Sequence, residues 1–237
     1  MPTTPAASDH HAEIPVMVVA GPPGAGKSTA MRTLRQELPG LLHFGVRVFF
    51  ERQMELGSSL GQRAKVFNES KIWHPDELIF EGIAHWLEEG LSTATLIVLE
   101  GFPRNRSQAL ALDSVLGEYG LRVNRTVHLD VPDDIAAARI TNREVCLTCD
   151  TIVADAIPLP GTACARCGQE LVRRPDDDEL SFRRRLTRQR QTRDELLAHY
   201  ETLGVLVEID GTRAPAEVAQ ALLLAVPAAP IAASRDA

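Results

Sequence analysis

The chain has 237 residues, of which 44% are hydrophobic and 24% charged, and these proportions exclude a disordered or fibrous protein. Its net charge of −7 argues against nucleic-acid binding through a global positive field, so we expect no nucleic-acid partner. The sequence has no apolar run of about 18 residues and no basic segment leading into an apolar one at its N-terminus, so we expect no membrane association and a cytoplasmic location.

Short apolar runs alternate with amphipathic stretches along most of the chain, which is the pattern of a parallel sheet covered by helices. Residues 1–13 and 228–237 lack this pattern and are expected to be disordered tails. We predict strands at 15–20, 95–100, 126–131 and 205–209. We predict helices at 27–37, 75–88, 105–117, 132–141, 176–203 and 214–224. Two segments, 45–76 and 142–175, interrupt the alternation and are read as insertions, the first with helical character.

The first predicted strand is followed by Gly-Pro-Pro-Gly-Ala-Gly-Lys-Ser-Thr, which fits the phosphate-loop pattern G-x-x-x-x-G-K-[ST] between a strand and a helix. Backbone N–H groups of such a loop bind phosphate oxygens, Lys27 reaches the β- and γ-phosphates, and the Ser28 hydroxyl binds Mg²⁺. ATP with Mg²⁺ is therefore the expected ligand, although the loop alone does not separate a kinase from a GTPase or a motor. The predicted binding residues are Gly21, Gly24, Ala25, Gly26, Lys27, Ser28 and Thr29.

The predicted strand 95–100 ends in Glu100, where a carboxylate that organises Mg²⁺ would lie beside the phosphate loop; a strand-end charge in solvent is the alternative. Gly101 and Arg104 follow on a turn that contains a proline, and Gln108 comes one helical turn later. Arg104 is placed to hold an anionic acceptor, and Gln108 could read a base edge. Trp73 lies in an apolar or amphipathic context and is expected to pack against other side chains, with stacking on a base as the alternative.

All four cysteines lie within residues 142–175, in the pairs Cys146/Cys149 and Cys164/Cys167. Two Cys-x-x-Cys knuckles at this spacing are typical of a tetrahedral zinc site. Four thiolates leave no open coordination position, so we expect structural Zn²⁺, with disulfides or reactive thiols as the alternative. A segment of about 35 residues with few large apolar side chains cannot form its own core, so the metal would hold it as a rigid flap.

These motifs together resemble the adenylate kinases, nucleoside monophosphate kinases with a loop of the form G-x-P-G-A-G-K and a later D-G-F-P-R. The resemblance covers residues 16–224 and includes Leu-Asp-Val-Pro-Asp at 129–133 and Ile-Asp-Gly at 209–211. It implies an α/β fold with a P-loop nucleoside triphosphate hydrolase-like core (14–44, 77–141 and 176–227), a helical NMP-binding insertion at 45–76 and a zinc-ribbon lid at 142–175. The implied reaction moves the γ-phosphoryl group of Mg-ATP to a nucleoside monophosphate, AMP above all, in a monomeric enzyme.

The resemblance also implies roles for the arginines. Arg139 and Arg213 would line the ATP adenine pocket, and Arg143 would contact the ATP phosphates. Arg174 and Arg185 would bridge the donor and acceptor phosphates. The acceptor nucleotide would be held by Gly101, Arg104, Gln108, Arg174 and Arg185. Since phosphoryl transfer leaves little covalent work to the enzyme, the expected catalytic residues are Lys27, Arg104, Arg143, Arg174 and Arg185, and no general base is expected.

One segment departs from the family pattern Ser-Thr-Gly-Asp-x-x-Arg at the acceptor site: residues 44–52 read Phe-Gly-Val-Arg-Val-Phe-Phe-Glu-Arg. Counting back from the matching residues 57–61 places Glu51 at the position of the acceptor-phosphate arginine, so either Arg47 or Arg52 would substitute. Residues 46–50 could equally be a buried apolar segment. The alternative functions are a P-loop kinase for another nucleotide or a small metabolite and, more remotely, a non-catalytic zinc-knuckle binding protein.

Overall fold

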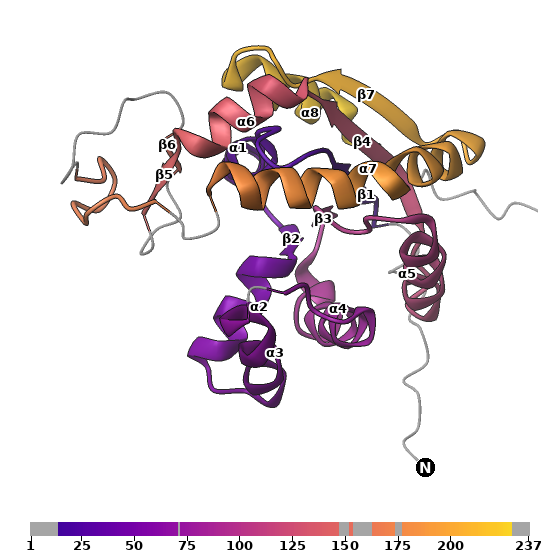
Figure 1. The fold of residues 1–237 in the computed structure, drawn as a ribbon. Helices are drawn as coiled ribbons and strands as arrows, with labels where there is room; N and C mark the ends of the chain where they lie inside the picture. Colours follow the sequence, from indigo (N-terminus) through magenta and orange to yellow (C-terminus); the bar gives the residue numbers. More distant parts are fainter. Residues whose placement is uncertain (1–13, 71, 147–151, 154–162, 174–176, 229–237) are drawn as a thin grey trace, which may run out of the picture.

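A computed structural model of the protein describes residues 14–70, 72–146, 152–153, 163–173 and 177–228, and its centre is a five-stranded parallel sheet (Figure 1). The strand order is β2-β3-β1-β4-β7. The strands are β1 (Val16–Ala20), β2 (Leu41–Gly45), β3 (Leu96–Glu100), β4 (Val123–Asp130) and β7 (Leu206–Asp210). Every residue of β1 is buried, because the middle strand of a parallel sheet is covered on both faces. This explains its continuous apolar sequence.

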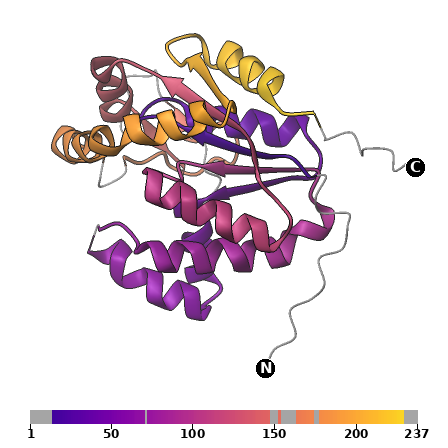
Figure 2. The same cartoon turned by 90° about the vertical axis from the view of Figure 1, so that its right-hand side faces the viewer.

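Helices cover both faces of this sheet (Figure 2). On one face α1 (Lys27–Glu37), α6 (Asp133–Thr141) and α8 (Pro215–Ala225) enclose one apolar core. On the other face α4 (Asp76–Gly90), the short helix η2 (Leu91–Thr93) and α5 (Arg106–Glu118) enclose a second. The long helix α7 (Glu179–Thr202) contributes Phe182 to the first core and Tyr200 to the second. The predicted α/β fold, a parallel sheet between two layers of helices, is confirmed.

Two groups of elements project from the sheet (Figure 1). Helices α2 (Val46–Glu55) and α3 (Ser59–Glu69) pack on each other so closely that a Cβ atom at Gly61 would lie 2.2 Å from the carbonyl oxygen of Gln53. The Ser58 side chain caps α3 by accepting from the Gly61 N–H. Strands β5 (Glu144–Val145) and β6 (Ile152–Val153) form an antiparallel ribbon, and a bridge between Val145 and Val172 joins it to the chain that returns to α7.

The structure adds one strand to the central sheet, and the short strands β5 and β6 outside it, that the sequence pattern did not predict. Residues 41–45 form β2 at the edge of the sheet, where three of the five residues are only partly buried and none is β-branched. Residues 46–50 begin α2, which buries Phe49 and Phe50 but leaves Arg47 exposed. The predicted tails, apart from residue 228, lie outside the described residues. In the part of the chain that is described, we find no helix with the length and apolar character of a membrane span.

Candidate active site

A cavity of about 1720 Å³ lies at the end of the sheet where β1 and β3 finish. Ligands of open α/β folds bind at the carboxyl ends of the strands. The cavity is lined by the phosphate loop, the first turns of α1 and α2, the loop after β3, and parts of α6 and α7. The predicted residues that line it are Gly24, Ala25, Gly26, Lys27, Ser28, Thr29, Arg47, Gly101, Arg104, Arg139, Arg143, Arg185 and Arg213. Side chains from distant segments therefore converge on one space.

The phosphate loop has the backbone shape that its glycines predict. Gly24 has φ +84°, and a Cβ atom there would lie 2.5 Å from the carbonyl oxygen of Ala136. The Lys27 ammonium donates to the carbonyl oxygens of Gly21 at 2.7 Å and Pro22 at 2.8 Å. Burial lowers the pKa of Lys27 to about 8, against the opposing effect of a nearby carboxylate. A partly desolvated cation at the N-terminus of α1 is suited to binding an anion.

Ser28 and Glu100 offer two oxygen atoms beside this loop. The Ser28 hydroxyl donates to Glu100 Oε1 at 2.5 Å, and His43 Nε2 lies 3.0 Å from Glu100 Oε2. Burial raises the pKa of Glu100, but the hydrogen bonds and charges of His43, Ser28 and Lys27 outweigh it, and the net shift is downward. An ionised carboxylate and a hydroxyl are the oxygen ligands that Mg²⁺ prefers, so the pair fits a magnesium site.

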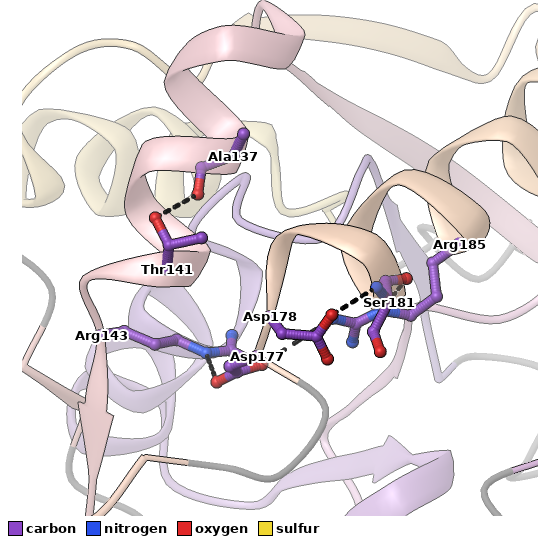
Figure 3. Close-up of polar contacts among 7 residues, drawn as sticks. All are labelled: Ala137, Thr141, Arg143, Asp177, Asp178, Ser181 and Arg185. Atoms are coloured by element: carbon purple, nitrogen blue, oxygen red, sulfur yellow. Dashed lines mark hydrogen bonds and ion pairs between the residues drawn. The ribbon is translucent and has the colours of Figure 1, made fainter.

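Two of the predicted arginines share one buried carboxylate, Asp177 (Figure 3). Arg143 donates to both of its oxygens, from Nε at 2.5 Å and from a terminal nitrogen at 2.6 Å, and a terminal nitrogen of Arg185 lies 3.8 Å away. The Asp177 side chain is 1% exposed. The next residue, Asp178, caps α7 by accepting from the Ser181 N–H at 2.8 Å. Asp177 thus ties the segment after α6 to the start of α7. The predicted Arg174 lies outside the described residues.

Arg104 is fixed at the end of the cavity that α2 and the segment before α4 enclose. Its Nε donates to the Gly101 carbonyl oxygen at 3.0 Å, and its guanidinium lies 4.4 Å from the ring centroid of Trp73. Burial lowers its pKa to about 10. Gln108 does not belong to the cavity lining among the described residues: it accepts from the Arg104 N–H at 2.7 Å and donates to Asp76 at 2.7 Å. Gln108 therefore supports the turn that carries Arg104 through hydrogen bonds to Arg104 and Asp76.

The two candidate replacements for the acceptor arginine lie in different surroundings. Arg47, in the first turn of α2, lines the cavity together with Glu51. The Arg52 side chain is 65% exposed, is not among the described residues of the lining, and lies 3.3 Å from the Glu55 carboxylate. The geometry therefore favours Arg47.

At the far side of the phosphate loop, Arg139 closes the cavity against the turn after β7. Its guanidinium donates to the carbonyl oxygens of Gly211 at 2.7 Å and Thr212 at 3.3 Å. Arg213, 56% exposed, lies 3.6 Å from the Asp210 carboxylate. The arrangement leaves a flat guanidinium and backbone groups along one wall, which suits a planar base.

Three of the four cysteines gather at one point. The sulfur atoms of Cys146, Cys164 and Cys167 all lie within 4.8 Å of one another, and those of Cys146 and Cys167 are 3.4 Å apart. Sulfurs around a tetrahedral zinc ion, at about 2.3 Å from the metal, lie about 3.8 Å apart, so these three thiols fit such a site. Cys149, the fourth predicted ligand, lies outside the described residues.

Comparison with known proteins identifies the family. The adenylate kinase family model matches residues 19–205. The chain belongs to the adenylate kinase family. Similar adenylate kinases include that of Dehalococcoides mccartyi strain BAV1, 32% identical over 211 residues (89% of this chain and 97% of the relative). Those of Moorella thermoacetica and Archaeoglobus fulgidus are 34% identical over 201 residues (84% and 91%) and 30% identical over 199 residues (83% and 91%). The protein is thus a phosphotransferase that acts on a nucleoside monophosphate.

In this adenylate kinase family member, the sequence pattern missed three residues of the site. His43 lies on the unpredicted strand β2, which pairs Gly45 with Glu100 and so brings His43 to the carboxylate. Trp73, expected only to pack against other side chains, also lines the cavity. Arg188 of α7 contacts the Trp73 ring at 4.8 Å from its centroid. No local motif marks any of the three, because each acts through a contact between distant segments.

Proposed function

We propose that the protein transfers the γ-phosphoryl group of Mg-ATP to AMP, forming two molecules of ADP. The observation that carries this proposal is that one cavity is lined at one end by the phosphate loop and Arg139, and at the other by Arg47 and Arg104. Arg143 and Arg185 lie between these ends and share Asp177. Such a cavity has room and charge for two nucleotides whose phosphates meet.

The proposed parts of the molecule follow the two projections from the sheet. Residues 14–44, 77–141 and 176–227 form the core that holds the donor, and residues 45–76, with α2 and α3, form the acceptor-binding insertion. Residues 142–175, with β5, β6 and the cysteine cluster, form the lid. The thiols of Cys146, Cys164 and Cys167, with Cys149, would hold Zn²⁺, whose role is structural because four thiolates complete its coordination. A rigid lid can close over ATP and exclude water.

The proposed chemistry is electrostatic. Phosphoryl transfer spreads negative charge over the equatorial oxygens, so fixed cations lower the barrier without covalent catalysis. Lys27 would bind the β- and γ-phosphates and the loop N–H groups would cradle them. Arg143 and Arg185 would turn from Asp177 to the transferring group, and Arg104 would hold the acceptor phosphate. Mg²⁺, held through Ser28 and Glu100, would neutralise charge on the donor. An acceptor monophosphate is already an anion, so no side chain has to remove a proton.

Arg47 is the proposed replacement for the acceptor arginine that Glu51 displaces. The two residues are one helical turn apart on α2 and both line the cavity, so a cation at either position reaches the same space. Arg47 also lowers the pKa values of Arg104 and His74, although burial is the larger cause in both cases. These effects support a positive potential at the acceptor end of the cavity.

The test is a coupled assay of ADP formation from ATP with AMP, GMP, CMP and UMP as acceptors. We expect AMP to give the largest kcat/KM, and Lys27→Met to lower it by about a thousandfold or more, since charge stabilisation of this kind is the main catalytic term. Lys65→Met is the matched control, because Lys65 is 65% exposed and pairs with Glu69. A larger kcat/KM for another monophosphate would replace AMP as the acceptor, and full activity of Lys27→Met would refute the mechanism.

The acceptor assignment has its own matched pair of variants. Arg47→Ala should raise the KM for AMP at least about tenfold, the effect of losing one charged hydrogen-bonding partner. Arg52→Ala should leave it within about twofold, because exposed ion pairs contribute little. The reverse result would assign the role to Arg52 and contradict the geometric argument.

A further inference from the structure

The indole ring of Trp73 contacts two guanidinium groups that come from distant parts of the chain. Arg104, in the loop after β3, lies 4.4 Å from the ring centroid, and Arg188, in α7, lies 4.8 Å from it. All three residues line the active-site cavity. Both distances are within the range of about 6 Å over which a cation is attracted to an aromatic face. The half-buried ring therefore serves as a shared platform for two cations.

The charges around Arg104 are mostly positive. Burial is the main cause of its lowered pKa, and Arg47, Arg185 and Arg188 lower it further, while Asp76 raises it. Arg188 forms no ion pair with any residue that the structure describes. Among those residues, the indole of Trp73 is the group that fixes the position of its guanidinium. Several guanidinium groups gathered at the end of a cavity favour a ligand with more than one negative charge, such as a phosphate monoester.

The platform also explains the choice of arginine at both positions. A guanidinium that lies flat on an indole still presents its N–H groups along its edge, where they can form paired hydrogen bonds with phosphate oxygens. The Arg104 plane is fixed by the bond from its Nε to the Gly101 carbonyl oxygen, 3.0 Å long. Arg188 is exposed on its helix and makes no such bond to a described residue, so its orientation depends on the ring.

We propose that Arg188 binds the phosphate of the acceptor nucleotide, and that Trp73 is a positioning residue that holds both Arg188 and Arg104 against its ring. The inference rests on the proposed transfer to a nucleoside monophosphate and adds a specificity-determining contact to it. Glu51 occupies the position where the resemblance implies an arginine, and Arg188 would supply a positive charge at the same end of the cavity. The acceptor phosphate is thus held from two sides, by α2 through Arg47 and by α7 through Arg188.

The kinetic test compares Arg188→Ala with Arg184→Ala. Arg184 is exposed on the same helix one turn earlier and lines the same cavity, so it controls for a general loss of positive charge. Arg188→Ala should raise the KM for AMP about tenfold, equivalent to about 1.4 kcal/mol, and leave the KM for ATP within about twofold. Arg188→Lys should restore only part of the loss, because an ammonium cannot stack and bind in a paired fashion. Equal effects of the two alanine variants on the KM for AMP would overturn the inference.

A binding measurement separates this inference from the proposed reaction. The chain has two tryptophans, so Trp86→Phe leaves Trp73 as the only tryptophan emitter. Adding AMP should change the Trp73 emission, and Arg188→Ala in this background should weaken the apparent affinity about tenfold, which corresponds to about 1.4 kcal/mol. An AMP affinity that does not depend on Arg188 would refute the proposed contact. If AMP binds in an Arg188-dependent way but no ADP forms, the proposed function fails and the phosphate contact stands.

Discussion

Asp177 is the residue whose loss should most clearly loosen the proposed lid (142–175) from the proposed core. Its carboxylate is 1% exposed and accepts two hydrogen bonds from Arg143, whose side chain is 15% exposed. Removing one partner of a fully buried ion pair costs about 3–5 kcal/mol. Arg143 and Arg185 keep some contact with water and can be partly rehydrated, so we expect Asp177→Ala to lower the free energy of unfolding by about 2–3 kcal/mol. Asp177→Asn keeps the shape and one acceptor, and should cost about half as much.

The assay is urea unfolding of the zinc-loaded protein followed by circular dichroism, with Asp194→Ala as the control. Asp194 is 79% exposed and contacts the neighbouring Arg193, so its loss should cost less than about 0.5 kcal/mol. A double-mutant cycle with Arg143→Gln should give a coupling energy of at least about 1 kcal/mol, because the two side chains share two hydrogen bonds. Turnover should fall as well, since Arg143 and Arg185 would lose the partner that orients them.

Asp177 does not hold these segments together if Asp177→Ala and Asp194→Ala unfold at the same urea concentration, or if the cycle yields no coupling. Either result would mean that the bidentate contact is replaced by water at no cost. A loss of stability without loss of turnover would show that Asp177 supports the fold alone and does not prepare the arginines.

Three further outcomes follow from individual contacts. Burial lowers the pKa of His74 to about 4, so its NMR signals should not titrate between about pH 7 and 5.5. The His74 side chain takes up its proton near pH 6.5 in the unfolded chain but only near pH 4 in the folded protein, so the free energy of unfolding should fall as the pH drops from about 6.5 toward 4. His74→Gln should make the free energy of unfolding depend less on pH in this range. An unchanged pH dependence would contradict the lowered pKa. Gly24→Ala should weaken ATP binding at least about tenfold in calorimetry, since the new Cβ would meet the Ala136 carbonyl oxygen at 2.5 Å, whereas Gly117→Ala, with open space at its Cβ, should not. Cys146→Ser should abolish zinc binding measured by elemental analysis and increase proteolysis of residues 142–175 before that of the core; full zinc retention would contradict the thiolate site.

Features that depend on neighbouring residues in the sequence could be predicted. The phosphate loop is one contiguous motif between a strand and a helix, so its position after β1 and the placement of Lys27 and Ser28 followed directly. The central strands were recognisable because burial on both faces requires continuous apolar runs. Glu100 could be placed near the phosphate loop because it ends a buried strand and parallel strands end at one edge of the sheet. Its side chain is in fact hydrogen bonded to that of Ser28.

Features that depend on contacts between distant segments could not be predicted. The strand β2 lies at the edge of the sheet, has no β-branched residue and has three partly exposed residues, so its pattern carried no strand signal and His43 went unnoticed. The choice between Arg47 and Arg52 needed the start of α2, because each helical residue turns by about 100° and an error of one residue changes the face. The pairing of Arg143 with Asp177 spans 34 positions and leaves no trace in local spacing.

The charges at the acceptor end connect this site to the lid through a single helix. Arg185 and Arg188 are three residues apart on α7 and therefore lie on one face, with Arg185 directed at Asp177 and Arg188 at Trp73. A ligand that draws Arg188 toward its phosphate acts on the same helix whose first turns, through Arg185 and Asp177, contact Arg143 of the proposed lid. Glu51, at the position where the resemblance implies an arginine, lies on α2 of the proposed acceptor insertion, whereas Arg188 lies on α7. Because part of the positive charge lies on α7 and not on α2, acceptor binding depends on the position of α7. Asp177 contacts Arg185 of that helix, so substitutions at Asp177 should weaken AMP binding as well as ATP binding.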